Sequence, residues 1–94
     1  MDLTIVTPTY NRRHKISDLY KSLQSQTLLD FEWIIIDDGS EDNTSEIVKQ
    51  WIENSEFRIR YFYKENGGKH TAINYALKII ETELTFIVDS DDIL

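Results

Sequence analysis

The strongest constraint on the fold of this 94-residue chain is a regular alternation between short apolar runs and helical patterns. Four runs have the length and the β-branched or aromatic composition of strands, namely 3–7, 31–36, 57–64 and 84–88. Between the first two, apolar residues recur at helical spacing at Ile16, Leu19, Tyr20 and Leu23. Strands that alternate with helices of this length predict an α/β fold with parallel strands and right-handed crossovers.

Two further helices complete the predicted alternation. The first is expected to carry one apolar stripe, formed by Ile47, Val48, Trp51 and Ile52. Asn43 and Glu46 resemble a capping box at its start. The second is expected to bury one face, formed by Ala72, Ile73, Ala76, Leu77 and Ile80.

The strand patterns also predict the order of the strands, numbered along the chain. Run 31–36 is apolar enough to be buried on both faces, and run 84–88 lacks alternation and should be interior. Arg58, Arg60 and Lys64 interleave with apolar residues, as in an edge strand. We therefore expect the order 3-2-1-4, with strand 1 ending before Pro8. The winding then reverses between strands 1 and 4, and in open α/β sheets ligands bind at such a switch point, at the carboxyl ends of the strands.

Charge and composition narrow the class of partner. The net charge of −7 disfavours nucleic acid or an anionic membrane as the main partner. The absence of cysteine excludes disulfides and thiolate chemistry. The N-terminal apolar run is too short for a signal peptide or a membrane span. The sequence predicts one soluble, cytoplasmic domain over residues 1–94.

Three carboxylates follow strand 4 directly: Asp89, Asp91 and Asp92. Acids this close repel one another, and a hard cation with oxygen ligands, Mg²⁺ or Mn²⁺, would relieve the repulsion. The alternative is a solvated acidic turn, for which these residue types are ordinary. Their place at the carboxyl end of a central strand favours the cation site.

A second acidic turn follows strand 2. Asp37 comes directly after three isoleucines, so it should be less exposed than its neighbour Asp38 and could accept hydrogen bonds from a ribose or a base N–H. The alternative is a turn or capping acid, which describes Asp38 and Asp42 better. Both turns lie at the edge of the sheet where strand 1 also ends.

Tyr10 and Lys69 lie in the two remaining loops of interest. Tyr10 could stack on a planar base, or could pack on the first helix as a rim tyrosine. Gly67 and Gly68 precede a helix N-terminus, a place that favours anions, so Lys69 could meet a phosphate or a sugar hydroxyl. The alternative is that these residues only form the boundary between a loop and the following helix. A P-loop is excluded, because it would need Gly at position 63 and Ser or Thr at position 70, where Tyr and His stand.

Four motifs, in order and over nearly the whole chain, resemble the family 2 glycosyltransferases of GT-A fold: "VTPTYNR", "IIIDDGSEDNT", "ENGGKHTAIN" and "FIVDSDD". The resemblance implies a Rossmann-like nucleotide-diphospho-sugar transferase fold, of which residues 1–94 would be the donor-binding N-terminal half, truncated after strand 4. It implies that Pro8, Thr9 and Tyr10 hold the base and that Asp37 bonds it. It further implies that Asp89, Asp91 and Asp92 hold Mn²⁺ or Mg²⁺ and reach the ribose or sugar.

The reaction implied by this resemblance is inverting transfer of a sugar from a nucleotide-diphosphate sugar to an acceptor hydroxyl on a saccharide or a lipid-linked molecule. A UDP-sugar is the favoured donor, because it is the commonest in the family. The family's general base lies in the acceptor half, beyond Leu94, so no catalytic residue and no turnover are expected within these residues. The parent enzyme could then work at the cytoplasmic face of the membrane, and the edge of strand 4 is expected to cause self-association.

Two alternatives from other classes remain open. One is a non-catalytic nucleotide-binding module. The other is a metal-dependent phosphohydrolase of the haloacid dehalogenase kind, which would place its D-x-D motif on the first strand rather than the fourth.

Overall fold

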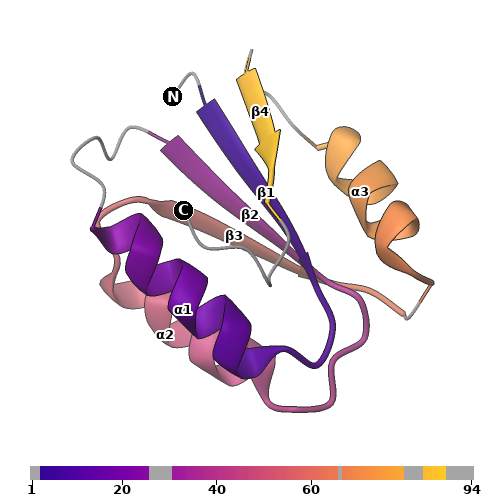
Figure 1. Cartoon of the computed structure of the whole chain (residues 1–94), viewed down its shortest axis with the longest axis horizontal. Coiled ribbons are helices and arrows are strands. Elements are labelled where there is room, and N and C mark those ends of the chain that lie inside the picture. The colour runs from indigo at the N-terminus through magenta and orange to yellow at the C-terminus, as the bar shows by residue number, and fades with distance from the viewer. Residues whose placement is uncertain (1–2, 26–30, 66, 80–83, 89–94) are drawn as a thin grey trace.

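A computed structural model of the chain describes residues 3–25, 31–65, 67–79 and 84–88. The elements along these residues are β1 (Leu3–Thr9), α1 (Arg13–Gln24), β2 (Phe31–Asp37), α2 (Thr44–Asn54), β3 (Arg58–Tyr63), α3 (Lys69–Leu77) and β4 (Leu84–Ile87). The strands form one sheet of order β3-β2-β1-β4, and each neighbouring pair is parallel (Figure 1). The predicted α/β class and strand order are confirmed.

Helices α1 and α2 lie side by side on one face of the sheet, and α3 lies on the other (Figure 1). Successive side chains of a strand point to opposite faces, so the all-apolar β2 supplies both cores. On the α1/α2 face, Trp33 and Ile35 join the larger core. Tyr20 of α1 joins Trp33 and Trp51 in a cluster of three nearly parallel rings, with centroids 6.1 Å (Tyr20–Trp33), 4.3 Å (Tyr20–Trp51) and 5.9 Å (Trp33–Trp51) apart.

The smaller core lies under α3. Val6, Ile34 and Ile36 pack against Ala72 and Ala76, two small residues one helical turn apart. The helix therefore buries a narrow stripe.

The predicted apolar faces of the two later helices were too wide. Leu77 is 59% exposed, and Ile52 of α2 is 43% exposed. Each neighbours a buried residue, Ala76 or Trp51, and adjacent helical positions point about 100° apart. Ile80 lies outside the described residues.

Strand β1 continues through Pro8 to Thr9, so the expectation that Pro8 ends the strand was wrong. Val6 accepts a hydrogen bond from Val88 N on the β4 side of the strand. Pro8 lies two residues after Val6, so its backbone nitrogen faces the same neighbouring strand, β4. The N–H that proline lacks therefore removes no hydrogen bond between β1 and β2. The β1–β2 pairing therefore runs on to the Thr9–Asp37 pair.

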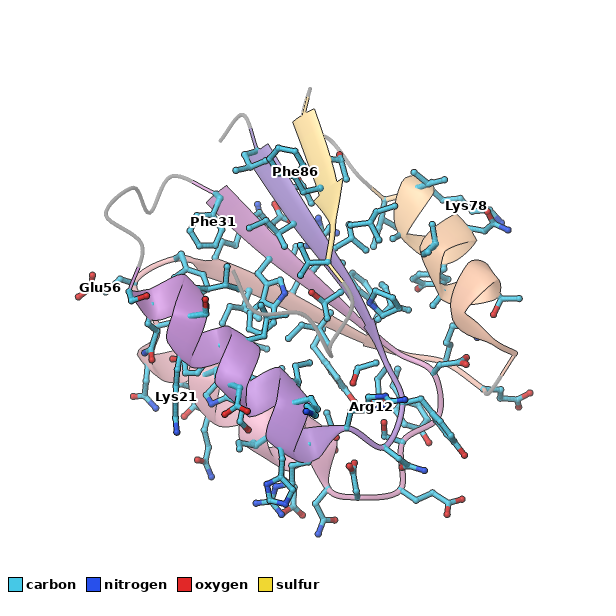
Figure 2. All side chains as sticks on the ribbon, viewed as in Figure 1. Arg12, Lys21, Phe31, Glu56, Lys78 and Phe86 are labelled. Carbon is cyan, nitrogen blue, oxygen red and sulfur yellow. The ribbon has the colours of Figure 1, made fainter. Side chains whose placement is uncertain are left out.

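The two outer strands differ in character. Strand β3 is an edge strand, as predicted, and Arg60 pairs with the buried Glu32 of β2 at 2.8 Å. Strand β4 is the other edge among the described strands, as the predicted order 3-2-1-4 implies, and Phe86 is half-exposed although its apolar run is typical of an interior strand. Figure 2 shows Phe86 at that edge. None of the described helices has the length and apolar character needed to cross a membrane.

Candidate functional site

Backbone hydrogen bonds join the carboxyl ends of β1, β2 and β3, and the edge of the sheet formed by these strand ends carries the candidate site. Asp38 N donates to Thr9 O at 2.8 Å, which joins the ends of β2 and β1. Lys64 N donates to Asp37 O at 2.9 Å, which joins the ends of β3 and β2. Figure 2 shows Arg12, on the loop after β1, at this edge, and Phe31 at the opposite end of the sheet. The loops after β1 and β2 converge here as predicted.

Thr9, the last residue of β1, has a side chain in an unusual environment. The residue is 3% exposed, and among the described residues its Oγ1 is a buried side-chain atom without a hydrogen-bond partner. Buried polar groups are nearly always hydrogen-bonded, so a hydroxyl left without a partner calls for an explanation. The neighbouring Thr7, two residues earlier on the same face, accepts a bond from Trp33 Nε1 at 2.9 Å. Thr9 therefore offers an unused donor and acceptor beside Asp37.

Tyr10 follows Thr9 and is 45% exposed, so its ring is available for stacking. The next residue, Asn11, has a left-handed backbone with φ of 50°. Its amide donates to Ser40 Oγ at 2.8 Å, and its side chain accepts from Glu41 N at 2.7 Å. These reciprocal bonds fix the Tyr10 loop to the loop after β2. Sequence reasoning missed Asn11, although asparagine is among the residues that adopt this conformation most readily.

Asp37 ends β2 and is fully buried, and it is less exposed than Asp38, as its sequence position predicted. One carboxylate oxygen accepts from Ser40 N at 2.8 Å, and the other accepts from the Tyr61 hydroxyl of β3. Burial, then the hydrogen bond to Asp37, raises the pKa of Tyr61 well above its usual range, so the phenol stays protonated as the donor. A carboxylate has about four acceptor positions, so two donors do not exhaust it.

Asp38 has a different environment, and its interpretation as a turn or capping acid was wrong. Its carboxylate pairs with the Lys64 ammonium and accepts from Gly67 N at 2.9 Å and Gly68 N at 2.8 Å. Burial alone would raise the pKa of Asp38, but the bonds from Lys64 and the two glycine amides outweigh it and hold that pKa below the usual value. Asp38 is therefore a buried anion that holds the loop between β3 and α3.

Asp42 bonds the starts of two helices: the Thr44 amide that opens α2, as its interpretation as a capping acid predicted, and the start of α1, which was not predicted. Its carboxylate accepts from Arg13 N, the first residue of α1, at 3.0 Å, and from the Thr44 hydroxyl. Burial raises the pKa of Asp42, and the hydrogen bonds from Thr44 and Arg13 lower it by more. Asn43 is left-handed and its side chain makes no capping bond to α2, so the predicted capping box with Glu46 does not form.

A depression of about 420 Å³ lies beside the start of α1, lined by Asn11, Arg12, Arg13, His14, Lys15 and Asp42. The four basic residues are exposed. Neither Thr9 nor Asp37 lines this depression, so it is adjacent to the predicted nucleotide residues rather than formed by them.

The structure leaves the remaining predicted site residues untested. Lys69 is the first residue of α3, and its side chain lies outside the described part of the chain. Asp89, Asp91 and Asp92 also lie outside it. Within residues 3–25, 31–65, 67–79 and 84–88, no cluster of three or more His, Cys, Asp or Glu could hold a metal ion. Val88, the last described residue of this segment, donates its amide hydrogen to Val6 O of β1. Asp89, the first of the predicted cation acids, follows it directly in the sequence.

The chain resembles proteins of known class over nearly its whole length. The sequence profile described as "Glycosyl transferase family 2" matches residues 4–94. The poly(ribitol-phosphate) β-N-acetylglucosaminyltransferase TarS of Staphylococcus aureus is 34% identical over 94 residues, which cover 98% of this chain and 16% of that protein.

Two solved structures share the fold closely. The crystal structure of S. aureus TarS 1–349 in complex with UDP-GlcNAc matches 99% of this chain and 27% of its own, with a TM-score of 0.89 and 34% identity. The mannosyltransferase PcManGT of Pyrobaculum calidifontis, in complex with GDP-Man and Mn²⁺, matches 98% of this chain and 28% of its own, with a TM-score of 0.90 and 28% identity.

The chain spans 15% and 33% of the lengths of two other curated relatives, uncharacterised glycosyltransferases of Rickettsia conorii and Mycoplasma genitalium. It corresponds to a fragment of the N-terminal domain of GT-A glycosyltransferases. The fold, the order of the motifs and the profile match together establish that the chain belongs to the family 2 glycosyltransferases.

Proposed function

We propose that this chain binds the nucleotide-diphosphate sugar of an inverting glycosyltransferase, which transfers the sugar to an acceptor hydroxyl with the help of a divalent cation. The observation that carries the proposal is the Thr9 hydroxyl. It is buried and has no partner among the described residues, at the carboxyl end of a central strand, in a member of a glycosyltransferase family. A ligand that hydrogen-bonds at this edge would supply the missing partner.

The base is proposed to bind at the end of β1. Pro8 and Thr9 form the floor, and Tyr10 stacks on the base with its exposed ring. Asp37 accepts a base N–H with its remaining acceptor capacity. The reciprocal bonds of Asn11 support this arrangement, because they hold the Tyr10 loop beside the end of β2 before any ligand arrives.

The diphosphate and the cation are proposed to lie toward β4. Asp89, Asp91 and Asp92 have the oxygen ligands that Mn²⁺ or Mg²⁺ prefers, and Asp89 also reaches the nucleotide. When bound, the cation would neutralise charge that develops on the diphosphate leaving group. Lys69, at the start of α3, is proposed to contact a phosphate or a sugar hydroxyl from the opposite side.

The donor is proposed to be a UDP-sugar, in line with the UDP-GlcNAc complex of a neighbour that shares 34% of its residues with this chain. The acceptor is proposed to be a saccharide or a lipid-linked molecule, activated by a general base that follows Leu94 in the parent enzyme. On this proposal the 94 residues bind the donor and transfer nothing by themselves.

Calorimetric titration of the chain with UDP and GDP, with and without Mn²⁺, tests the proposal. We expect UDP with Mn²⁺ to bind most tightly, because cation and diphosphate complete each other's ligand sets. Saturation at about 100 times Kd would also stabilise the folded chain by about 2.7 kcal/mol, which a thermal melt detects. No heat of binding and no thermal shift with either nucleotide, with or without the cation, would reject it.

A further inference from the structure

The Lys64 side chain is fully engaged at the base of the loop that leads into α3. Its ammonium pairs with Asp38 Oδ1, and it also donates to Glu65 O at 2.7 Å and to Thr71 Oγ1 at 3.0 Å. An ammonium has three N–H donors, so these contacts use all of them. The side chains of Lys64 and Asp38 are only 19% and 7% exposed.

The Asp38 carboxylate occupies the place that the sequence suggested for a ligand anion. Gly67 N and Gly68 N, the amides that precede α3, both donate to it. Amides at the start of a helix favour an anion, and here the anion belongs to the chain itself. A donor phosphate therefore does not use the amides of Gly67 and Gly68 while Asp38 accepts from them.

Gly67 fits against this network with no space to spare. A Cβ at Gly67 would meet Thr71 Oγ1 at 2.9 Å and Lys64 Nζ at 3.3 Å. Gly68 has φ of 96°, a conformation that favours glycine, and its carbonyl accepts from Thr71 Oγ1 at 2.7 Å. The two glycines let the loop close tightly over the ion pair.

The same residues connect this loop to the proposed nucleotide site. The Asp38 amide donates to Thr9 O, and the Lys64 amide donates to Asp37 O. A shift of the Asp38–Lys64 pair would therefore move the start of α3 relative to Thr9 and Asp37.

We propose that Asp38 and Lys64 are positioning residues for donor binding: their ion pair holds Gly67, Gly68 and the first turn of α3 against the strand ends, without touching the nucleotide sugar. This inference rests on the donor binding proposed above. It gives the second acid of the "DDGS" turn a role distinct from that of Asp37.

Nucleotide affinity of variants at the pair tests the inference. We expect Asp38→Asn and Lys64→Met each to weaken binding of UDP with Mn²⁺ roughly tenfold. Losses of this size are typical of residues that position the binding residues without contacting the ligand. The double variant should bind no more weakly than either single variant, because the two residues act as one unit. Hydrogen exchange at the Gly67 and Gly68 amides should accelerate in the same variants.

The chain offers a matched control on β2 and β3, the strands that Asp38 and Lys64 directly follow. Glu32, a buried residue near the start of β2, pairs with Arg60 of β3 at 2.8 Å and with Arg58 at 3.7 Å, and the Arg60 side chain is 23% exposed. Glu32→Gln should lower thermal stability to a comparable degree, but leave UDP affinity unchanged at a temperature where all variants are folded. Equal losses of affinity in Glu32→Gln and Asp38→Asn would overturn the inference, because the effect would then be general destabilisation.

A further variant keeps the test decisive if removing a buried charge unfolds the chain. Gly67→Ala retains both charges and crowds Lys64 and Thr71, and it should weaken UDP binding several-fold. If the wild-type chain binds no nucleotide, both the proposed function and this inference fail. If the wild type binds and Asp38→Asn, Lys64→Met and Gly67→Ala bind equally well, the positioning role alone is wrong.

Discussion

The carboxylates of Asp37 and Asp38 are adjacent in sequence and serve opposite faces of the sheet. Asp37 bonds the Tyr61 hydroxyl on the face covered by α1 and α2, whereas Asp38 bonds Lys64 and the amides before α3. This division follows from the alternation of a strand, which turns consecutive side chains to opposite sides. The two acids therefore make separable contributions, and substitutions can distinguish them.

The first prediction concerns Asp37 and its partner Tyr61. Asp37→Asn should weaken UDP binding roughly tenfold, as expected when a charged acceptor is lost. Tyr61→Phe should cost about 1–3 kcal/mol of stability, because a hydrogen bond to a buried carboxylate is lost, but should keep UDP affinity within about twofold. Calorimetry on both variants checks this. Equal losses of affinity would indicate that Asp37 only supports the fold.

The second prediction concerns the hydroxyl of Thr9. Thr9→Val keeps the β-branched shape and removes a buried polar group without a partner, so the free chain should become more stable by about 1 kcal/mol. UDP affinity should nevertheless fall, because the proposed ligand contact is lost. Denaturant unfolding and calorimetry measure the two effects.

Thr7→Val is the matched control on the same strand. It leaves Trp33 Nε1 without its acceptor, so stability should fall by about 1–3 kcal/mol while UDP affinity stays the same. A Thr9→Val variant that is both less stable and equally able to bind UDP would contradict the proposed site.

Much of the fold could be predicted from the sequence because local patterns encode it. The unbroken apolar run of β2 and the basic residues of β3 predicted an interior and an edge strand, and both assignments are confirmed. The motif order also predicted the family, and the profile match favours a transferase over the phosphohydrolase alternative.

The site was less predictable, because its contacts join residues far apart in sequence. Asp38 is 26 residues from Lys64, and Asp42 is 29 residues from Arg13, so no local spacing indicates either contact. Pro8 remains in its strand because of the direction in which its missing N–H points, which depends on the strand order. Whether Asp89 contacts the nucleotide stays a prediction.

The third prediction concerns pH and the Asp38–Lys64 pair. The pKa of Asp38 is lowered in the fold below its ordinary value of 3.8. A lowered carboxyl pKa stabilises the folded state above the unfolded value, and this contribution is lost as the pH falls through the folded value. The stability difference between the wild type and Asp38→Asn should be constant at neutral pH and should shrink below about pH 4.

Denaturant unfolding at a series of pH values measures that difference. Asp42 titrates in the same range, but it is present in both proteins and cancels. A difference that stays constant down to pH 2 would show that the ionised carboxylate of Asp38 does not stabilise the fold.

The fourth prediction concerns the cation. Mn²⁺ alone should bind weakly, and it should bind more tightly with UDP, because the diphosphate supplies missing ligands. Asp91→Asn should weaken this ternary complex at least several-fold, whereas Asp42→Asn, which removes a capping acid of α1, should not. Electron paramagnetic resonance of Mn²⁺ reports the bound fraction. Equal effects of the two variants would favour a solvated acidic turn at residues 89–92.

The fifth prediction is that the chain self-associates through β4. Among the described strands β4 pairs only with β1, and Phe86 and Ile87 are 52% and 48% exposed. Strand β3, the other edge, carries the charges of Arg58 and Arg60, which oppose pairing with another chain. Because β4 lacks such charges, its apolar side chains and the backbone groups that face away from β1, which pair with no other described strand, offer a template for a second copy. Sedimentation velocity at rising concentration should show dimers or larger species, and Ile87→Lys should shift the chain toward the monomer.

Arg58→Lys keeps the charge at the opposite edge and should leave the distribution unchanged. A wild-type chain that stays monomeric at every concentration would show that the outer edge of β4 is not available for pairing.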